Sequence, residues 1–360
     1  MLTLLLSGKA YAANEVPAVS AHSMILMHPD SGLVLAEKNA DESMLIASTT
    51  KLMTALVALE KLDPDREVVV DPLWTKVEGS SMYLRPGESY AVRDLLYGLM
   101  LASGNDAALA LAYTASGSPE EFAVLMNEKA QSLGLTDTHF TNPHGLDHED
   151  HYSTARDMAV LMSAVLDNEI LSQIIATKSY STHGATYVNH NKLLWRCKGV
   201  NGGKTGYTKA AGRCLVTSCE REDLSLVCVT LSAGDDWQDH TKLYDWAYSA
   251  YKSYSQSSQM PLAGVPVVAE DEVYAAVGPS QDVSLCVAKD SCIETRLYLP
   301  RFVFPKVSQG AVAGEFSLLV DGVEVGRWPL VWMKSIGREI ESWRMLLDRI
   351  SRSIFSIYYF

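Results

Sequence analysis

Apolar positions in the first two thirds of the chain repeat with two periods, one typical of strands and one typical of helices. Residues 23–27 and 33–37 are short apolar runs around the turn Pro29-Asp30-Ser31-Gly32, which predicts a β-hairpin. Strands at both ends with helices between them predict an α/β (α+β) fold, in which an antiparallel sheet lies between helices. Helices are predicted over residues 48–62, 92–102, 107–115, 120–133 and 236–254, and from a cap at Ser153 or Thr154 to residue 166, with buried strands over 212–219 and 224–233.

The pattern changes after residue 253. Residues 253–260 are rich in Ser and Gln, which is typical of a linker. Short strand-like runs with Gly and Pro turns follow over residues 262–332, and Asp321-Gly322 between two apolar runs is a hairpin signal. We therefore expect a first domain over residues 14–255 and a small all-β domain over residues 262–333.

The last segment, residues 334–360, predicts an amphipathic helix. Basic residues lie off its apolar stripe and aromatic residues end it, a pattern that favours the surface of an anionic membrane. Packing against protein is the alternative. The stripe consists of Ile336, Ile340, Trp343, Leu347, Ile350 and Ile354.

The first 13 residues resemble the end of a secretion signal. Leu2 to Leu6 is a short apolar run, and Ala10-Tyr11-Ala12 fits a small-x-small cleavage pattern. The mature protein would then begin near Asn14. A disordered cytosolic N-terminus is the alternative. Together with the tail, the signal predicts an exported protein that lies peripherally on the outer face of the cytoplasmic membrane.

Charge and cysteine content narrow the function further. The net charge of −13 over 360 residues argues against a nucleic-acid partner, because phosphate binding requires clustered Lys and Arg. The six cysteines show no zinc-ligand spacing. Cys286 and Cys292 lie where a disulfide could bridge a hairpin. Cys214, Cys219 and Cys228 lie in strand-like apolar runs and are expected to be small buried core residues. We expect no metal and no cofactor.

Three short motifs carry the candidate chemistry. Ser48 lies three residues before Lys51 at a predicted helix start, so both side chains lie on one face of the first turn. A buried lysine that has lost its proton can accept the proton of a serine hydroxyl. Ser103-Gly104-Asn105 and Lys204-Thr205-Gly206 follow in order, and the set of three motifs marks serine acyl-transfer enzymes of the β-lactamase and penicillin-binding protein type.

From residue 20 to residue 360 the chain resembles the low-molecular-mass penicillin-binding proteins, which are serine-type D-alanyl-D-alanine carboxypeptidases of the peptidase S11 family. Members from Gram-positive, spore-forming bacteria are the most similar. The resemblance implies a β-lactamase/transpeptidase-like domain, a β-rich second domain and a terminal helix. It is carried by Ala47-Ser48-Thr49-Thr50-Lys51, Ala102-Ser103-Gly104-Asn105-Asp106, Asn142-Pro143-His144-Gly145-Leu146 and Lys204-Thr205-Gly206-Tyr207-Thr208.

This resemblance implies a role for each motif residue. Ser48 would be the nucleophile and Lys51 its base, while Ser103 would bridge Lys51 and Lys204 and relay a proton to the leaving amine. The substrate would be the D-Ala-D-Ala end of a peptidoglycan stem peptide, and β-lactam antibiotics would acylate Ser48. Asn105 would be a partner of Lys51 and of substrate, and the backbone N–H groups of Ser48 and Tyr207 would form the oxyanion hole. The terminal carboxylate would be held on an edge strand that contains Lys204, Thr205, Gly206, Tyr207 and Thr208, and Gly206, which has no side chain, would let substrate lie against this strand. Arg213 would add a further positive charge, with a surface salt bridge as the alternative.

Several alternatives remain open from the residues. His144 and the stretch Asp147-His148-Glu149-Asp150-His151 could suggest a metal site, but they lack a zinc-ligand frame. A class A β-lactamase would need a Glu for deacylation, and no Glu-x-x-Leu-Asn segment lies between the second and third motifs. An endopeptidase or a transpeptidase would use the same residues with another acceptor. A wall-binding protein without activity would have lost a catalytic side chain.

Overall fold

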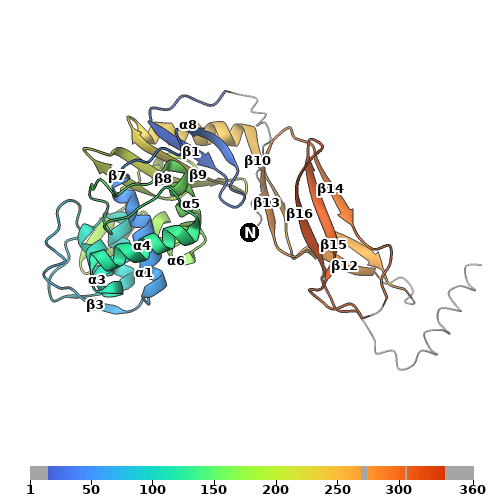
Figure 1. Ribbon diagram of the computed structural model, residues 1–360, viewed down its shortest axis with the longest axis horizontal. Helices are drawn as coiled ribbons and strands as arrows, with labels where there is room; N and C mark the ends of the chain where they lie inside the picture. The colour runs from blue at the N-terminus through green and yellow to red at the C-terminus, as the bar shows by residue number, and fades with distance from the viewer. Residues whose placement is uncertain (1–14, 269–273, 305, 337–360) are drawn as a thin grey trace, which may run out of the picture. The chain divides into compact units, whose positions relative to one another are not determined.

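The computed structural model describes residues 15–268, 274–304 and 306–336, and the chain forms two compact units (Figure 1). The N-terminal unit ends at Lys252 and the C-terminal unit begins at Ser253. The predicted signal remnant, residues 1–13, and residues 337–360 of the predicted tail helix lie outside the described residues.

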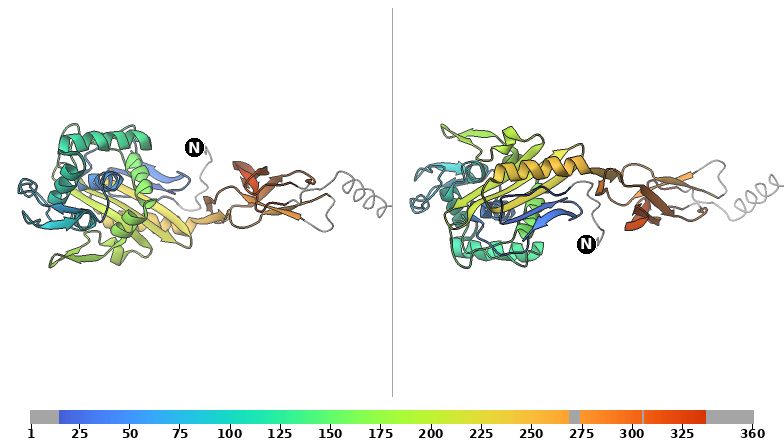
Figure 2. Two further views of the ribbon diagram at one scale, coloured as in Figure 1. Left: turned by 90° about the horizontal axis from the view of Figure 1, so that it is seen from below. Right: turned by 90° about the horizontal axis from the view of Figure 1, so that it is seen from above.

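A five-stranded sheet in the order β2-β1-β9-β8-β7 forms the centre of the N-terminal unit. All of its neighbouring strands are antiparallel, as the sequence pattern predicts. Helix α8 (Asp236–Ala250) covers one face and α5 (Ala155–Leu166) lies on the other (Figure 2). The strands are β1 (Ser23–Met27), β2 (Val34–Lys38), β7 (Val200–Thr208), β8 (Gly212–Arg221) and β9 (Leu224–Ala233), and β7 is an edge strand.

A helical layer inserted between β2 and β7 packs around α1 (Lys51–Lys61). Residues 51–58 of α1 are all buried, so this part of the helix is surrounded by protein, and only its last turn reaches water. The other elements of this layer are the 3₁₀ turn η1 (Ala47–Thr50), the helices α2 (Val92–Leu101), α3 (Asn105–Ser116), α4 (Pro119–Leu133), α6 (Glu169–Ala176) and α7 (Leu193–Arg196), and the hairpins β3 (Glu67–Val69) with β4 (Ser89–Ala91) and β5 (Ser179–Thr182) with β6 (Ala185–Val188).

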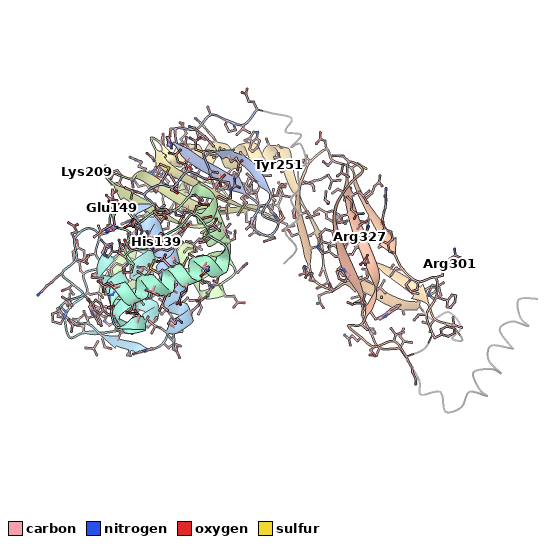
Figure 3. All side chains as sticks on the ribbon, in the orientation of Figure 1. His139, Glu149, Lys209, Tyr251, Arg301 and Arg327 are labelled. Carbon is pink, nitrogen blue, oxygen red and sulfur yellow. The ribbon has the colours of Figure 1, made fainter. Side chains whose placement is uncertain are left out.

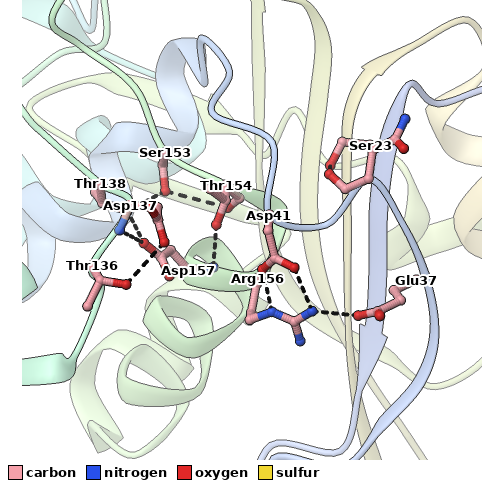
Figure 4. Close-up of polar contacts among 11 residues, drawn as sticks. Ser23, Glu37, Asp41, Thr136, Asp137, Thr138, Ser153, Thr154, Arg156 and Asp157 are labelled. Atoms are coloured by element: carbon pink, nitrogen blue, oxygen red, sulfur yellow. Dashed lines mark hydrogen bonds and ion pairs between the residues drawn. The ribbon is translucent and has the colours of Figure 1, made fainter.

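Polar contacts fix the start of α5 and the loop before it (Figure 4). Thr154 caps the helix by accepting a hydrogen bond from the backbone N–H of Asp157 at 3.0 Å. Asp157 in turn accepts from the Thr138 hydroxyl at 2.7 Å. Arg156 donates to Asp41 and to Glu37, each at 2.6 Å, and these carboxylates raise the pKa of its guanidinium. Both ends of the segment 138–154 are therefore held in place.

The C-terminal unit is built of β-strands. Its larger sheet has the order β11-β12-β16-β15-β14, and β10 pairs with β13. Asp321 and Gly322 both have positive φ, of 52° and 81°, in the predicted hairpin turn. Arg327 of β16, labelled in Figure 3, forms an ion pair with Glu324 at 3.2 Å. The strands are β10 (Tyr251–Gln256), β11 (Ala263–Pro266), β12 (Tyr274–Pro279), β13 (Val283–Ala288), β14 (Ile293–Tyr298), β15 (Val312–Val320) and β16 (Val323–Trp332).

Two expectations near the unit boundary were wrong. The helix predicted to reach residue 254 ends at Ala250, and strand β10 occupies residues 251–256 of the predicted helix and linker. The backbone of residues 251–256 pairs with β13, a long-range contact that the local composition does not indicate.

All six cysteines are free, so the disulfide considered between Cys286, which is buried, and Cys292, which is exposed, is not formed. In the part of the chain that the structure describes, no single helix has the length and apolar content needed to cross a membrane, although α5 and α6, bent by 107°, meet that test as a pair.

Candidate active site

Ser48 lies in a short 3₁₀ turn that leads directly into α1. Ala47 before it has φ of +46°, a left-handed conformation that is costly for a residue with a side chain. The hydroxyls of Thr49 and Thr50 bond back to the carbonyls of Ile46 and Ala47 at 2.6 and 2.8 Å. Ser48 is thus the hydroxyl of this turn that faces Lys51, whose Nζ lies 3.0 Å from its Oγ.

Lys51 is fully buried at the first position of α1. Besides Ser48, its Nζ donates to Asn105 Oδ1 at 2.7 Å and to the His144 carbonyl oxygen at 2.6 Å. Burial lowers the pKa of Lys51 well below its usual 10.5, and the charge of Lys204 lowers it further, while Asp106 acts in the opposite direction. The site therefore favours an uncharged amine next to the serine.

The second motif forms the turn between α2 and α3. Ser103 has φ of +58°, and Asn105 is the first residue of α3. The side chain of Asn105 donates to the Glu78 carbonyl at 2.6 Å, so its oxygen is directed at Lys51. Asp106 accepts from the backbone N–H groups of Met82 and Leu84 at 2.9 and 3.0 Å and so fixes the neighbouring loop. Sequence reasoning gave Asp106 no role.

Lys204 brings the third motif to the same place. It is 1% exposed on β7, and its Nζ donates to Ser103 Oγ at 3.0 Å and to the Thr205 carbonyl at 2.8 Å. Burial lowers its pKa to about 7. The expected bridge through Ser103 is present on the Lys204 side. Among the hydrogen bonds of the described residues, Lys51 bonds to Ser48, Asn105 and His144 but not to Ser103.

Gly206 lets β7 approach the nucleophile turn. A Cβ at this position would lie 3.0 Å from both the Ile46 oxygen and the Ser48 nitrogen, and 3.1 Å from the Thr49 nitrogen. The glycine was expected to make room for substrate along the strand. In the structure its missing side chain makes room for the backbone of the serine turn.

The remaining expected residues lie along the same strand and its neighbour. Tyr207 is 66% exposed, and the Thr208 hydroxyl donates to Asp147 at 2.8 Å. Arg213 lies opposite Tyr207 on β8 and forms an ion pair with Asp236 at 3.3 Å. The Arg213 side chain is 51% exposed, so it reaches solvent beside the strand end.

The loop over residues 141–151 contributes more to the site than its sequence indicates. Asn142 Oδ1 accepts from the Gly145 N–H at 2.7 Å, which holds the His144 carbonyl toward Lys51. His151 bonds to the Thr50 hydroxyl at 2.8 Å, and burial lowers its pKa to about 3. Sequence reasoning missed the His144 carbonyl because a backbone group leaves no trace in residue type. Within the described ranges, no group of three or more His, Cys, Asp and Glu side chains could hold a metal ion.

Comparisons with known proteins identify the family to which this chain is similar. Residues 10–235 match the family model Peptidase_S11, described as D-alanyl-D-alanine carboxypeptidase. The chain is 32% identical to D-alanyl-D-alanine carboxypeptidase DacF of Bacillus subtilis, over 87% of this chain and 85% of that protein. It is 34% identical to DacC of Escherichia coli, over 91% and 88%. A solved structure of penicillin binding protein 5 from Haemophilus influenzae has a TM-score of 0.74 at 28% identity, covering 89% of this chain and 99% of that one.

Proposed function

The chain belongs to the peptidase S11 family and is a serine-type D-alanyl-D-alanine carboxypeptidase, and we propose that Ser48 is its nucleophile. The N-terminal unit, corresponding to the domain expected over residues 14–255, carries the chemistry because every candidate site residue belongs to it. The single observation that carries the proposal is the 3.0 Å contact between Ser48 Oγ and the buried amine of Lys51.

The hydrogen-bond partners of the Lys51 amine determine where its lone pair would point when the amine is neutral. Asn105 Oδ1 and the His144 carbonyl can only accept hydrogen bonds, so they occupy the two N–H groups of an uncharged amine. The remaining lone pair then faces the Ser48 hydroxyl. Lys51 accepts the proton as Ser48 Oγ attacks the carbonyl carbon of the penultimate D-Ala.

The developing oxyanion lies against the backbone N–H groups of Ser48 and Tyr207. The close packing of Gly206 on the Ser48 backbone supports this placement, because it brings the strand and the turn together. Lys204 and Thr205 hold the terminal carboxylate, with Thr208 further along the same strand and Arg213 on the neighbouring strand β8.

Departure of the terminal D-Ala requires a proton on its amine. Ser103 Oγ supplies it and is reprotonated from Lys204, with which it shares a 3.0 Å hydrogen bond. The proton that Lys51 took from Ser48 then passes on to Lys204, which leaves Lys51 neutral and Lys204 charged before the next step. Water then hydrolyses the ester on Ser48, with Lys51 again as the base. A β-lactam presents a similar carbonyl and carboxylate, so it acylates the same serine. Loss of the terminal D-Ala removes a donor for cross-linking of peptidoglycan.

The experiment is turnover of diacetyl-Lys-D-Ala-D-Ala together with labelling by fluorescent penicillin. Ser48→Ala should abolish both D-Ala release and labelling. Ser132→Ala is the matched control, because Ser132 is an exposed serine on α4 that bonds only to its own helix. Persistence of either activity in Ser48→Ala would show that another residue is the nucleophile.

Residues 334–360 hold the protein at the outer surface of the cytoplasmic membrane, after export directed by a signal that ends near residue 13. The support is the sequence pattern of the tail, with one apolar stripe and flanking Arg residues. In flotation with vesicles containing anionic lipid, the full chain should rise with the vesicles and a chain ending at residue 333 should stay at the bottom. Equal flotation of the two proteins would contradict the assignment.

A further inference from the structure

An open cleft of about 1050 Å³ lies beside the candidate active site in the N-terminal unit. One wall is the loop from Ser80 to Arg85, and the other is formed by the β5–β6 hairpin and the segment that leads into α7. The Tyr187 hydroxyl donates to the Met82 carbonyl at 2.9 Å and ties the two walls together. The two walls of the cleft are therefore held in place by a hydrogen bond within the unit.

The cleft adjoins the residues that hold the reacting bond. Its lining includes Ala102, the residue before Ser103. The Ser80 carbonyl accepts from the Asn105 N–H at 2.8 Å. His190, also in the lining, has its pKa lowered by burial and by the nearby charge of Lys204. Substrate that precedes the scissile bond can continue from Ser48 into this cleft.

Among Lys, Arg, Asp and Glu, the side chains that line the cleft are all basic. Arg85, Lys192 and Arg196 face the cleft, whereas no Asp or Glu lines it. Arg85 is partly neutralised by Glu88 at 3.3 Å. Lys192 and Arg196 are exposed, and neither forms an ion pair with a carboxylate among the residues that the structure describes. Between them, Trp195 is 49% exposed and offers a flat apolar surface.

We propose that this cleft binds an acidic segment of the substrate peptide upstream of the scissile bond, with Lys192 and Arg196 pairing with its carboxylate. The inference rests on the proposed function and adds a substrate preference to it. A carboxylate matches the guanidinium fork and the ammonium group, and the peptide backbone packs on the Trp195 ring. The enzyme should therefore select acidic peptides over neutral peptides of the same length.

The test compares peptides that end in D-Ala-D-Ala and carry either Glu or Gln at one of the three positions upstream. In low salt, the wild-type enzyme should have a kcat/KM about tenfold higher for the Glu peptide than for the Gln peptide at one of these positions. Two exposed ion pairs with the substrate carboxylate are sufficient for a difference of this size. The double variant Lys192→Gln/Arg196→Gln should bring this ratio close to one. Added salt should reduce the wild-type ratio, because both cations are exposed.

Lys198→Gln is the matched control, because Lys198 is an exposed lysine two residues beyond Arg196 and outside the cleft lining. It should keep the wild-type ratio. A wild-type ratio near one at all three positions, or an unchanged ratio in the double variant, would overturn the proposal. Release of D-Ala from the Gln peptides and labelling by fluorescent penicillin report on the proposed function separately, so the two ideas fail in different measurements.

Discussion

At the scale of single residues, the site depends on two lysines that are both buried and close enough to affect each other's charge. Lys51 faces Ser48, and Lys204 faces Ser103. Neutral Lys51 removes the repulsion between two buried cations while Lys204 keeps the charge that a carboxylate needs. In the proposed mechanism the same residue type therefore acts as a base in one position and as an anchor in the other.

This division of roles predicts a bell-shaped pH dependence for acylation by penicillin. The second-order rate should rise with pH as Lys51 loses its proton, with a midpoint well below 10.5. It should fall again as Lys204, whose pKa is about 7 in the free protein, loses the charge that holds the carboxylate. Lys51→Met should reduce the rate about a thousandfold. A rate that rises only near the pKa of an exposed lysine would contradict the assigned roles.

At the scale of elements, the sequence predicted the parts with strong periodicity and regular caps. Strand β9 was predicted with its observed bounds, and α2 and α4 within one residue at each end. The short hairpins β3–β4 and β5–β6 were missed, since runs of three or four residues carry little periodic signal. The three motifs were expected to meet, and they do so around Lys51 and Lys204. The contact between the His144 carbonyl and Lys51 involves a backbone atom and was not predictable from residue types.

Packing of that loop on the nucleophile turn makes Gly145 a sensitive position. Gly145 has φ of +84°, and a Cβ there would overlap the Ala47 carbonyl, 2.0 Å away. Gly145→Ala should lower the free energy of unfolding by about 3 kcal/mol. It should also slow acylation more than tenfold, because the His144 carbonyl moves away from Lys51.

Gly87→Ala is the matched control for this substitution. Gly87 has the same φ of +84°, but a Cβ there has nothing within 4 Å. This variant should lose only about 1 kcal/mol of stability and keep its acylation rate. Thermal unfolding and stopped-flow acylation measure the two effects, and equal rates in both variants would show that the loop contact does not matter.

At the scale of the whole molecule, buried neutral histidines couple stability to pH. His240 is fully buried between the hydroxyls of Thr217 and Thr230, at 2.7 and 2.9 Å, and links α8 to the sheet. Burial lowers its pKa from 6.5 to about 3. His144 and His151 are lowered in the same direction, to about 4 and about 3.

These histidines predict a loss of stability in mild acid. Between pH 6.5 and about 3 the unfolded chain binds a proton at His240 that the folded chain does not, so stability falls as pH falls through this window. His240 alone should contribute a loss of about 2 kcal/mol between pH 7 and pH 5. Denaturant unfolding of wild type and His240→Gln at the two pH values measures the difference. The same pH dependence in both proteins would contradict the prediction.

The central claim is that Ser48, activated by neutral Lys51, becomes the ester-linked residue of the reaction cycle. Mass spectrometry of peptides from the penicillin-treated protein locates the acyl group directly. We expect a single adduct on the peptide that contains Ser48, and no adduct over the same short reaction time when Lys51 is replaced by Met. An adduct on Ser103 or on any residue outside the nucleophile turn would contradict it.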